Sequence, residues 1–449
     1  MTAPSRHTSH LPPRSAASLP VRLQARTIEV DPALVDPYAL GARGGFVFAG
    51  TERQIAGPAA GGWTLSVPGG LADEPARRAL VVALSTIPHD RSAGAPGPPL
   101  VALGSLPFDR DAPASLVLPA LTFQRTEAGA WLTWVGTEVP PAPATLVNLV
   151  QHAAGARSAT DRPDGGPLGA APRLVLHTSD AAYAQGVAAV TSRIAAGKLQ
   201  KVVLARALDV VFPRPPALGP VLDRLRAAPG CTVFSLPVPG GQILGASPEL
   251  LVRRSGDRAR SLPLAGTQPA GTGRTDGTPE ALLGSTKDRA EHHLVVAEVV
   301  AALASVSTTV EVADAPFVVH LATMDHLGTP VAAQLASVDG VVPSALDLVA
   351  RLHPTPAVGG VPRPVALAVI NALETTGRGH WSGPAGWLDA EGDGEWIVAI
   401  RSATIKGRTA RIHAGAGIVE ASDPQAEAAE TALKLQTALD PVAPGLRLS

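Results

Sequence analysis

The spacing of apolar residues predicts long helices in the second half of the chain. Residues 180–196 carry apolar positions at helical spacing. Ser285 is a typical N-cap, with Asp288 three residues later, and it predicts a helix that runs to about residue 305. Residues 77–84 are apolar and fit either a helix or a strand.

Shorter apolar runs, bounded by turn residues, predict strands over much of the chain. Residues 115–121 and 130–135 are predicted to pair with each other, and residues 395–405 to form one strand. Turns at residues 239–241 and 255–257 indicate an antiparallel meander rather than a series of βαβ units. The remaining predicted strands are residues 44–50, 201–206, 232–236, 242–245, 250–254, 258–262, 386–389 and 409–413.

A helix is also predicted near the C-terminus, over residues 422–439. Ser422 is the predicted N-cap, and Gln425, three residues later, would complete a capping box. Pro424 falls in the first turn, where no backbone donor is needed. The segment before it, residues 414–419, consists of small and apolar residues. It is predicted to be a loop whose exposed backbone N–H groups bind an anion.

One face of this C-terminal helix carries Glu427, Glu430 and Lys434, at i, i+3 and i+7. A solvated face with a Glu–Lys pair explains the pattern by itself. The preceding small-residue segment favours a second interpretation, in which the loop holds an anion and the helix holds a cation. Both interpretations stay open on these residues alone.

Composition limits the classes of function. The chain has 449 residues, a net charge of −1 and a single cysteine, Cys231. We therefore expect no nucleic-acid partner and no cysteine-based zinc site. No charge-free apolar run approaches 18 residues, so we expect no membrane association and a cytoplasmic protein. Residues 1–25 are predicted to be a disordered tail, and residues 153–172 a linker.

Several ionisable residues are candidates for chemistry. Glu291 lies one helical turn after Asp288, and with Glu430 it would offer the one or two carboxylates that magnesium usually takes from a protein. Glu249 lies between a turn and an apolar strand, where burial would raise its pKa and suit it to act as a general acid. Lys201 begins an apolar strand, where desolvation would favour a base. An exposed strand-edge glutamate and a surface lysine are the simpler alternatives.

Together these stretches resemble the chorismate-utilising enzymes, and within them the isochorismate synthases of menaquinone and siderophore pathways. The resemblance spans roughly residues 175–440 and is weak before residue 170. It rests on eight ordered blocks: KVVLAR at 201–206, GASPELL at 245–251, PLAGT at 263–267, STKDRAEHH at 285–293, HLGT at 326–329, HPTPAVGG at 353–360, GWLDAEGDGEWIVAIRSA at 386–403 and AGAGIVEASDPQAEAAETALKLQT at 414–437.

The resemblance implies a role for each matching residue. Lys201 would activate water for attack at C2 of chorismate, and Glu249 would protonate the departing C4 hydroxyl. Glu291 and Glu430 would hold Mg²⁺, with Asp288 and Glu427 in support. The other residues expected to contact the substrate are Ala265, Gly266, Thr267, His326, Ala357, Gly360, Arg401, Gly415, Gly417 and Lys434.

Within this binding site, the resemblance gives two carboxylates of the substrate separate partners. The magnesium ion would hold the ring carboxylate, and Lys434 would lie close by. Arg401 and the backbone of Gly415 and Gly417 would clamp the enolpyruvyl carboxylate. His326 would lie near the leaving hydroxyl.

Differences among relatives favour isochorismate synthase. Anthranilate synthases lack a lysine at the position of Lys201, and aminodeoxychorismate synthases have a lysine where Ala265 stands. Salicylate synthases, the main alternative, typically have threonine near Ala357 and often tyrosine at Trp381. Thr267 departs from the serine of many isochorismate synthases. A non-catalytic chorismate-binding module is the remaining alternative, although the acid, the base and the metal ligands are all present.

The fold class expected from the resemblance is α/β of the α+β type, with large antiparallel sheets packed as a core and helices outside. Residues 26–170 would form the N-terminal part and residues 171–440 the chorismate-binding catalytic region. The resemblance also implies a monomer with its active site in a deep cleft.

Overall fold

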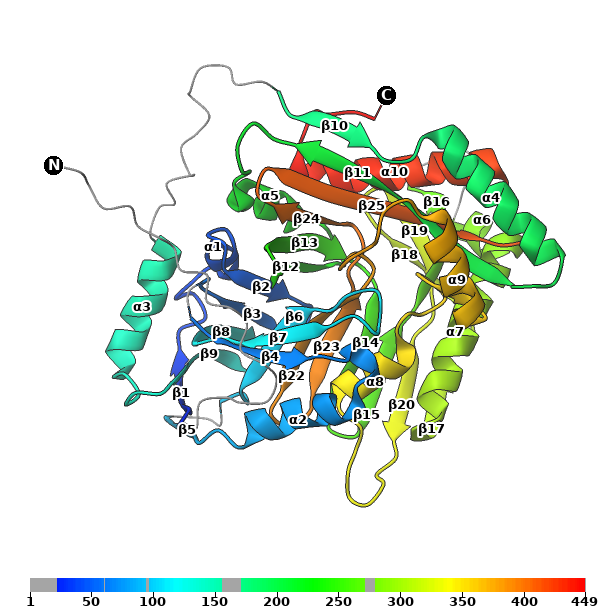
Figure 1. The fold of residues 1–449 in the computed structure, drawn as a ribbon. Coiled ribbons are helices and arrows are strands. Elements are labelled where there is room, and N and C mark those ends of the chain that lie inside the picture. Colours follow the sequence, from blue (N-terminus) through cyan, green and yellow to red (C-terminus); the bar gives the residue numbers. More distant parts are fainter. Residues whose placement is uncertain (1–21, 60, 94–96, 156–170, 271–278, 449) are drawn as a thin grey trace.

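A computed structural model describes residues 22–59, 61–93, 97–155, 171–270 and 279–448. Its strands form two large sheets and one small sheet, with helices around them (Figure 1). Among the described strands, every pair is antiparallel except β1 with β5. This arrangement confirms the predicted fold class.

The largest sheet has 13 described strands, in the order β10-β11-β25-β24-β13-β12-β2-β3-β8-β9-β1-β5, with β21 paired to β11. These strands are β1 (Gln24–Val30), β2 (Phe46–Ala49), β3 (Gln54–Gly57), β5 (His89–Ala93), β8 (Leu121–Thr126), β9 (Gly129–Gly136), β10 (Arg173–Leu176), β11 (Lys201–Val211), β12 (Thr232–Val238), β13 (Gly241–Ser247), β21 (Gly360–Val361), β24 (Ser402–Lys406) and β25 (Thr409–Ile418).

The second sheet has nine described strands, in the order β17-β20-β15-β14-β23-β22-β6-β7-β4, and the third has the order β16-β19-β18. The second contains β4 (Trp63–Val67), β6 (Val101–Ser105), β7 (Ala114–Leu118), β14 (Leu250–Ser255), β15 (Arg258–Leu262), β17 (Ser307–Val312), β20 (Val331–Leu335), β22 (Pro384–Asp389) and β23 (Gly394–Val398). The third contains β16 (Leu264–Pro269), β18 (Phe317–His320) and β19 (Met324–Gly328).

Helices cover the outer faces of the sheets (Figure 1). Helix α10 packs against β25 and α4, and α7 packs against β16, so both helices approach the same region. The helices are α1 (Pro37–Gly41), the 3₁₀ helix η1 (Gly70–Ala72), α2 (Glu74–Ser85), α3 (Pro143–Gly155), α4 (Asp180–Ala195), α5 (Leu218–Leu225), α6 (Pro279–Gly284), α7 (Thr286–Ala304), α8 (Ala345–Leu352), α9 (Arg363–Leu373) and α10 (Pro424–Val442).

Many predicted elements are confirmed. Helices α4 and α7 have the expected bounds, and Ser285 caps α7 by accepting a hydrogen bond from the Asp288 amide. Residues 77–84, whose apolar pattern fitted either a helix or a strand, belong to helix α2. Strand β11 begins at Lys201 as predicted and continues to Val211.

Both predicted hairpins are confirmed, but they do not form one continuous meander, because the chain changes sheets between them. Strands β12 and β13 form a hairpin in the 13-stranded sheet, whereas β14 and β15 form a hairpin in the nine-stranded sheet. The chain crosses between them at Pro248 and Glu249. Residues 395–405 likewise break into β23 and β24, one in each sheet, with the crossing at residues 399–401. Alternating patterns are the same in either sheet, so they could not reveal the crossings.

The N-terminal part shares its sheets with the catalytic region. Strand β2 pairs with β12, and β6 pairs with β22, so residues 26–170 form no separate sheet. The predicted pairing of 115–121 with 130–135 is wrong, because β7 lies in the nine-stranded sheet and β9 pairs with β8. Gln24 and Ala25, assigned to the tail, begin β1. Residues 1–21 and most of the predicted linker, 156–170, lie outside the described residues.

Two predictions near the C-terminus are also corrected. The small-residue segment 414–419 is not a loop, since β25 continues to Ile418 and pairs with β11 along its length. Helix α10 is capped by Asp423, which accepts hydrogen bonds from Gln425 N and Ala426 N. The Ser422 hydroxyl instead accepts from the Val419 amide. Both residues are good N-caps, and the hydroxyl of Ser422 is already engaged by the Val419 amide three residues earlier.

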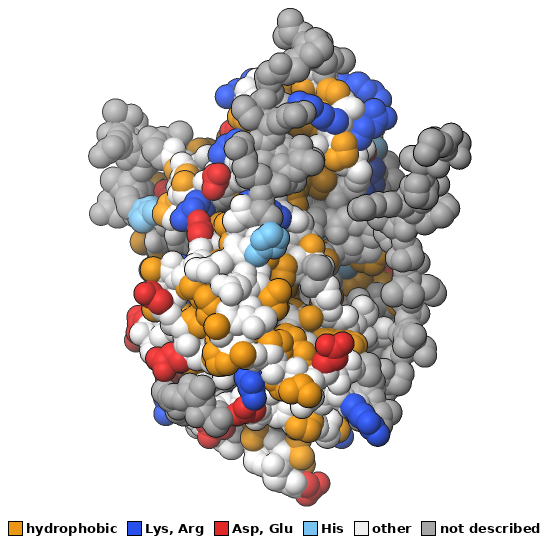
Figure 2. Space-filling model, turned by 90° about the vertical axis from the view of Figure 1, so that its left-hand side faces the viewer, with side chains coloured by type: hydrophobic (Ala, Val, Ile, Leu, Met, Phe, Trp, Pro, Cys, Tyr) orange, Lys and Arg blue, Asp and Glu red, His pale blue; other side chains and the backbone are white. Residues whose placement is uncertain are grey.

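The core is hydrophobic and lies between the sheets and under the helices, in three clusters of buried side chains. On the face drawn in Figure 2, hydrophobic side chains are spread over the centre, with acidic and basic ones interspersed around them. In the described part of the chain, no helix is both long and apolar enough to span a membrane.

Candidate functional site

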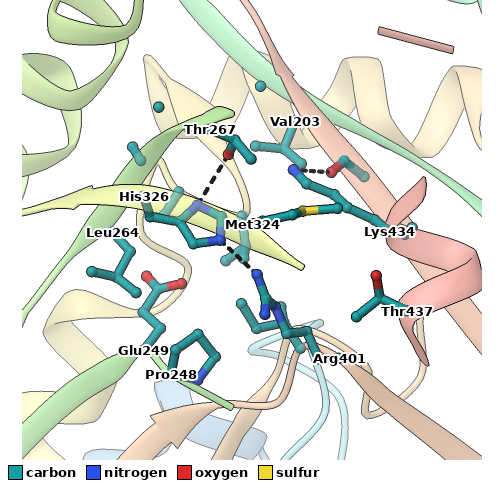
Figure 3. A pocket seen from close by; sticks show the side chains of 18 of the residues that line it. Val203, Pro248, Glu249, Leu264, Thr267, Met324, His326, Arg401, Lys434 and Thr437 are labelled. Carbon is teal, nitrogen blue, oxygen red and sulfur yellow. Dashed lines mark hydrogen bonds between the residues drawn. The ribbon is translucent and has the colours of Figure 1, made fainter. Parts of the chain in front are cut away.

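A cavity of about 90 Å³ opens where the chain crosses between the sheets. Glu249 comes from the β13–β14 crossing, and Arg401 from the β23–β24 crossing. Strand β25 and helix α10 supply further lining residues, among them Lys434 (Figure 3). Short segments that leave one sheet for another thus bring together residues that lie far apart in the sequence.

Glu249 is buried, with 3% of its surface exposed, and its carboxyl group lies at the cavity beside Leu264 and His326 (Figure 3). Burial raises the pKa of this carboxyl to about 8, while the positive charges of Lys201 and Lys434 act in the opposite direction. Desolvation outweighs attraction because the ionised form would lose most of its hydration. Glu249 therefore carries a proton at neutral pH, as expected for a general acid.

Arg401 is held in the cavity by a short chain of hydrogen bonds (Figure 3). Its Nη2 lies 2.6 Å from His326 Nε2, and His326 Nδ1 lies 3.0 Å from Thr267 Oγ1. Because arginine only donates, Nε2 accepts and Nδ1 carries the imidazole proton. Burial, together with Arg401 and Lys434, lowers the pKa of His326 well below its usual range, so this histidine is neutral.

The backbone of Arg401 has φ +52°, in the left-handed region that a non-glycine residue seldom adopts. Such residues concentrate at functional sites, because the surrounding structure must hold them there. Arg401 is largely buried, and burial lowers the pKa of its guanidinium below the usual value. Its position fits the predicted role of an anion clamp.

Ala265, Gly266 and Thr267 line the cavity from β16. The pairing of β16 with β19 is interrupted between Ala265 and Thr267, and Gly266 occupies this irregularity with φ +74°. A side chain at Gly266 would also press against Asp288 of α7. Glycine therefore allows the strand to bulge toward the helix.

The edge of β25 forms another wall, at Gly415 and Gly417. Beyond residue 412, β25 is paired with β11 but no longer with β24. Lys434 Nζ donates to the Gly415 carbonyl at 3.1 Å. A Cβ at Gly417 would collide with the Glu291 carboxylate and the Lys201 side chain, so glycine is needed there for both to approach.

Lys201 is fully buried and does not line the cavity directly; it lies behind Gly417. Its Nζ is 3.0 Å from Glu291 Oε1, an ion pair by distance whose angles do not meet those of a hydrogen bond. The Glu291 carboxylate therefore lies directly against the nitrogen that would have to act as the base.

Three glutamates of α7 and α10 are each paired with a lysine. Lys201 pairs with Glu291, Lys434 with Glu430 at 2.7 Å, and Lys287 with Glu427 at 2.7 Å. Glu427 is only 1% exposed, so the solvated-face interpretation is wrong for it, whereas the expected i,i+4 pair is present.

These carboxylates together raise the pKa of Lys287. Although burial lowers the pKa of the Lys287 ammonium, its hydrogen bond to Glu427 and the charges of Glu427, Glu430 and Glu291 raise it above the usual value. Burial and the charge of Glu430 raise the pKa of Glu427. The two helices therefore concentrate negative charge in one place.

Asp288 links the start of α7 to strand β16. Its carboxylate accepts hydrogen bonds from the Ser285 hydroxyl at the start of α7 and from the Thr267 amide, at 3.3 Å, in β16. Burial raises the pKa of Asp288. Within the described residues, no three acidic, histidine or cysteine side chains converge as a ready metal cage.

The remaining predicted residues divide into two groups. Ala357 lines the cavity as expected. Gly360 does not; it pairs with Val202 in the short strand β21, and a side chain there would collide with the Lys201 carbonyl. Glu430, Asp288 and Glu427 also lie outside the cavity lining.

Sequence reasoning missed several residues that line the cavity. Most lie one or two residues from a predicted residue, which is the signal that could have found them. Trp381 was considered only as a subfamily marker, and its ring stacks on His413 with centroids 5.2 Å apart. The missed residues are Val203, Pro248, Leu264, Met324, Trp381, Ile400, His413 and Thr437.

The fold and this site define a class of protein. Residues 86–442 match the family described as chorismate binding enzyme, and this match covers most of the chain. The chain therefore belongs to the chorismate-binding enzyme family, which confirms the resemblance noted in the sequence blocks.

Several named relatives and solved structures within this family are similar to the chain. The chain is 41% identical over 268 residues to the isochorismate synthase DhbC of Bacillus subtilis, covering 57% of this chain and 66% of that protein. It is 36% identical over 361 residues to a protein named putative isochorismate synthase MenF in Mycobacterium tuberculosis, covering 78% and 87%. The solved structure of the menaquinone-specific isochorismate synthase MenF from Escherichia coli is similar with a TM-score of 0.73 and 25% identity, covering 93% and 94% of the two chains.

Proposed function

We propose that this protein is an isochorismate synthase, a magnesium-dependent isomerase that converts chorismate reversibly to isochorismate. Water would add at C2 and the C4 hydroxyl would leave, with a shift of the ring double bond. The names of the relatives support this activity. The observation that carries it is Glu249, a buried carboxyl on the cavity wall whose pKa is raised to about 8.

The departing hydroxyl needs a proton, because hydroxide is a poor leaving group at neutral pH. Glu249 holds such a proton and faces the cavity. Arg401 and Lys434 also line the cavity and would hold the carboxylates of chorismate, a small dianion. Neutral His326 adds no positive charge and fixes the direction of the Arg401 guanidinium.

Lys201 would remove a proton from the attacking water. It could do so only as the neutral amine, and its nitrogen lies 3.0 Å from the Glu291 carboxylate. A cation bound to Glu291 would compete with Lys201 for this carboxylate. Gly417 lines the cavity, and its lack of a side chain lets Lys201 and Glu291 approach each other just behind the cavity wall.

Magnesium would be held by carboxylates that α7 and α10 carry. Glu291 and Glu430 would be its ligands, and two carboxylates with water and substrate oxygens are a common set for this ion. Asp288 and Glu427 would support them from one helical turn away. The bound ion would supply positive charge to hold the ring carboxylate of the substrate.

Product analysis on the purified protein tests this function. Incubation with chorismate and magnesium should yield isochorismate with little pyruvate, and incubation with isochorismate should yield chorismate. Salicylate and pyruvate appearing in step with the loss of chorismate would instead identify a salicylate synthase. Binding of chorismate without any turnover would identify a non-catalytic module.

A further inference from the structure

Arg378 is a buried cation close behind the cavity that has no part in the proposed chemistry. It is 5% exposed and does not line the cavity. Its guanidinium forms an ion pair with Glu374, and Nε donates to Glu374 Oε2 at 2.9 Å. A buried pair of this kind stabilises a fold only weakly, so another role must be considered.

The guanidinium joins three parts of the cavity wall. Nη2 donates to the Val203 carbonyl of β11 at 2.9 Å, and Nη1 donates to the Val358 carbonyl at 2.6 Å. The Arg378 Cζ atom also lies 5.3 Å from the centre of the Trp381 ring. Val203, Val358 and Trp381 all line the cavity.

The contacts continue on both sides of Arg378. On one side, Trp381 stacks on His413 of β25, with an angle of 21° between the rings. On the other side, the Arg378 Cζ atom lies 4.3 Å from the centre of the Phe108 ring. Its partner Glu374 accepts a hydrogen bond from the Ala205 amide, at 2.9 Å, and so ties the pair to β11 a second time.

We propose that Arg378 is a positioning residue that sets the shape of the substrate cavity by fixing Trp381 and the Val203 and Val358 backbones. This inference rests on the proposed function, because it assigns the cavity to chorismate. The planar guanidinium of Arg378 donates hydrogen bonds in several directions at once, and the ammonium group of a lysine cannot reproduce these contacts. The wall beside Ala357, a position that distinguishes related activities, therefore depends on a residue outside the cavity.

The test replaces Arg378 with lysine, which keeps the charge opposite Glu374 and removes the fork. Chorismate binding is measured by calorimetry, and kcat and KM by the formation of isochorismate. Arg378→Lys should raise both Kd and KM about tenfold and change kcat by less than about threefold, because a misplaced wall weakens binding more than it removes chemistry.

Arg254→Lys is the matched control. Arg254 is also buried, at 7% exposure, and pairs with Asp393 at 2.5 Å in the nine-stranded sheet, away from the cavity. If Arg378→Lys binds chorismate as the parent does, or if both variants weaken binding equally, Arg378 has only a structural role and the inference is wrong.

A second variant covers the case in which Arg378→Lys does not fold. Glu374→Gln combined with Arg378→Gln removes both charges together, so that no buried charge is left unpaired. The same loss of affinity is expected for this pair, and parent-like affinity would overturn the inference. Because binding is measured separately, a parent that binds chorismate without converting it would contradict the proposed function and not the role of Arg378.

Discussion

The carboxylates of this site fall into two groups with opposite environments. Glu249 lies at the crossing between two sheets, where burial outweighs the attraction of lysines and raises its pKa to about 8. On α7 and α10, by contrast, Glu291, Glu427 and Glu430 each lie within 3.0 Å of a lysine nitrogen. Glu249 is therefore protonated, whereas the glutamates of α7 and α10 form ion pairs with lysines.

The difference follows from the elements that carry the residues. The crossing at residues 248–249 is short and buries Glu249 next to Pro248, with no other ionisable residue in the segment. Two facing helices present side chains at every turn, so acids and lysines meet both within a helix and between helices. Glu249 and Glu291 both line the cavity, whereas Glu430 and Glu427 lie outside its lining.

The largest effect is expected where the cation site is removed. Glu291→Ala and Glu430→Ala should each abolish turnover, and chelation by EDTA should do the same to the parent until magnesium returns. Glu291→Ala also leaves the buried Lys201 without its ion pair, so folding of this variant is checked alongside activity. Magnesium binding, measured by calorimetry, should be lost in both variants. Glu298→Gln, at an exposed glutamate of the same helix α7, is the control. Full activity in EDTA would contradict the assignment.

The acid group is tested by Glu249→Gln, which keeps the shape of the side chain and removes its proton. The forward rate should fall at least about a hundredfold, the usual scale for a general acid, while chorismate affinity is retained. Glu395→Gln controls for the loss of a buried glutamate elsewhere, in β23. Weak chorismate binding with an unchanged turnover number would make Glu249 a binding residue instead.

Lys201→Ala tests the residue proposed as the base. We expect at least about a hundredfold loss of rate with chorismate still bound. The change also leaves Glu291 without its ion pair, so magnesium binding should be measured alongside activity. A variant that keeps its rate would place the base elsewhere in the cavity.

The sequence predicted the helices that carry these residues better than the crossings between sheets. Ser285 and the apolar spacing after it were sufficient to predict α7, because capping and periodicity are local. The crossings at residues 248–249 and 399–401 were missed, because alternating patterns do not show which sheet a strand joins. Glycine and alanine at 414–417 indicated a loop, whereas pairing with β11 makes them a strand. The Lys287–Glu427 contact joins two helices and has no local signal.

A smaller effect is expected on stability. Because the folded state raises the pKa of Glu249, it favours the protonated form, and the stability of the parent should fall as the pH rises from about 4.5 to about 8. Glu249→Gln should therefore become more stable relative to the parent over this range, by a few kcal/mol at most, since one pKa unit corresponds to about 1.4 kcal/mol. Chemical denaturation at pH 5 and pH 8 measures this difference, and a constant difference would contradict it.

The protonation state of Glu249 can be measured directly by infrared difference spectroscopy. The spectrum of the Glu249→Gln variant is subtracted from that of the parent at a series of pH values. We predict that the band of a protonated carboxyl is present in the parent at pH 7, and disappears with a midpoint near pH 8. A carboxylate band already complete at pH 6 would show that Glu249 is ionised at neutral pH and cannot donate the proton.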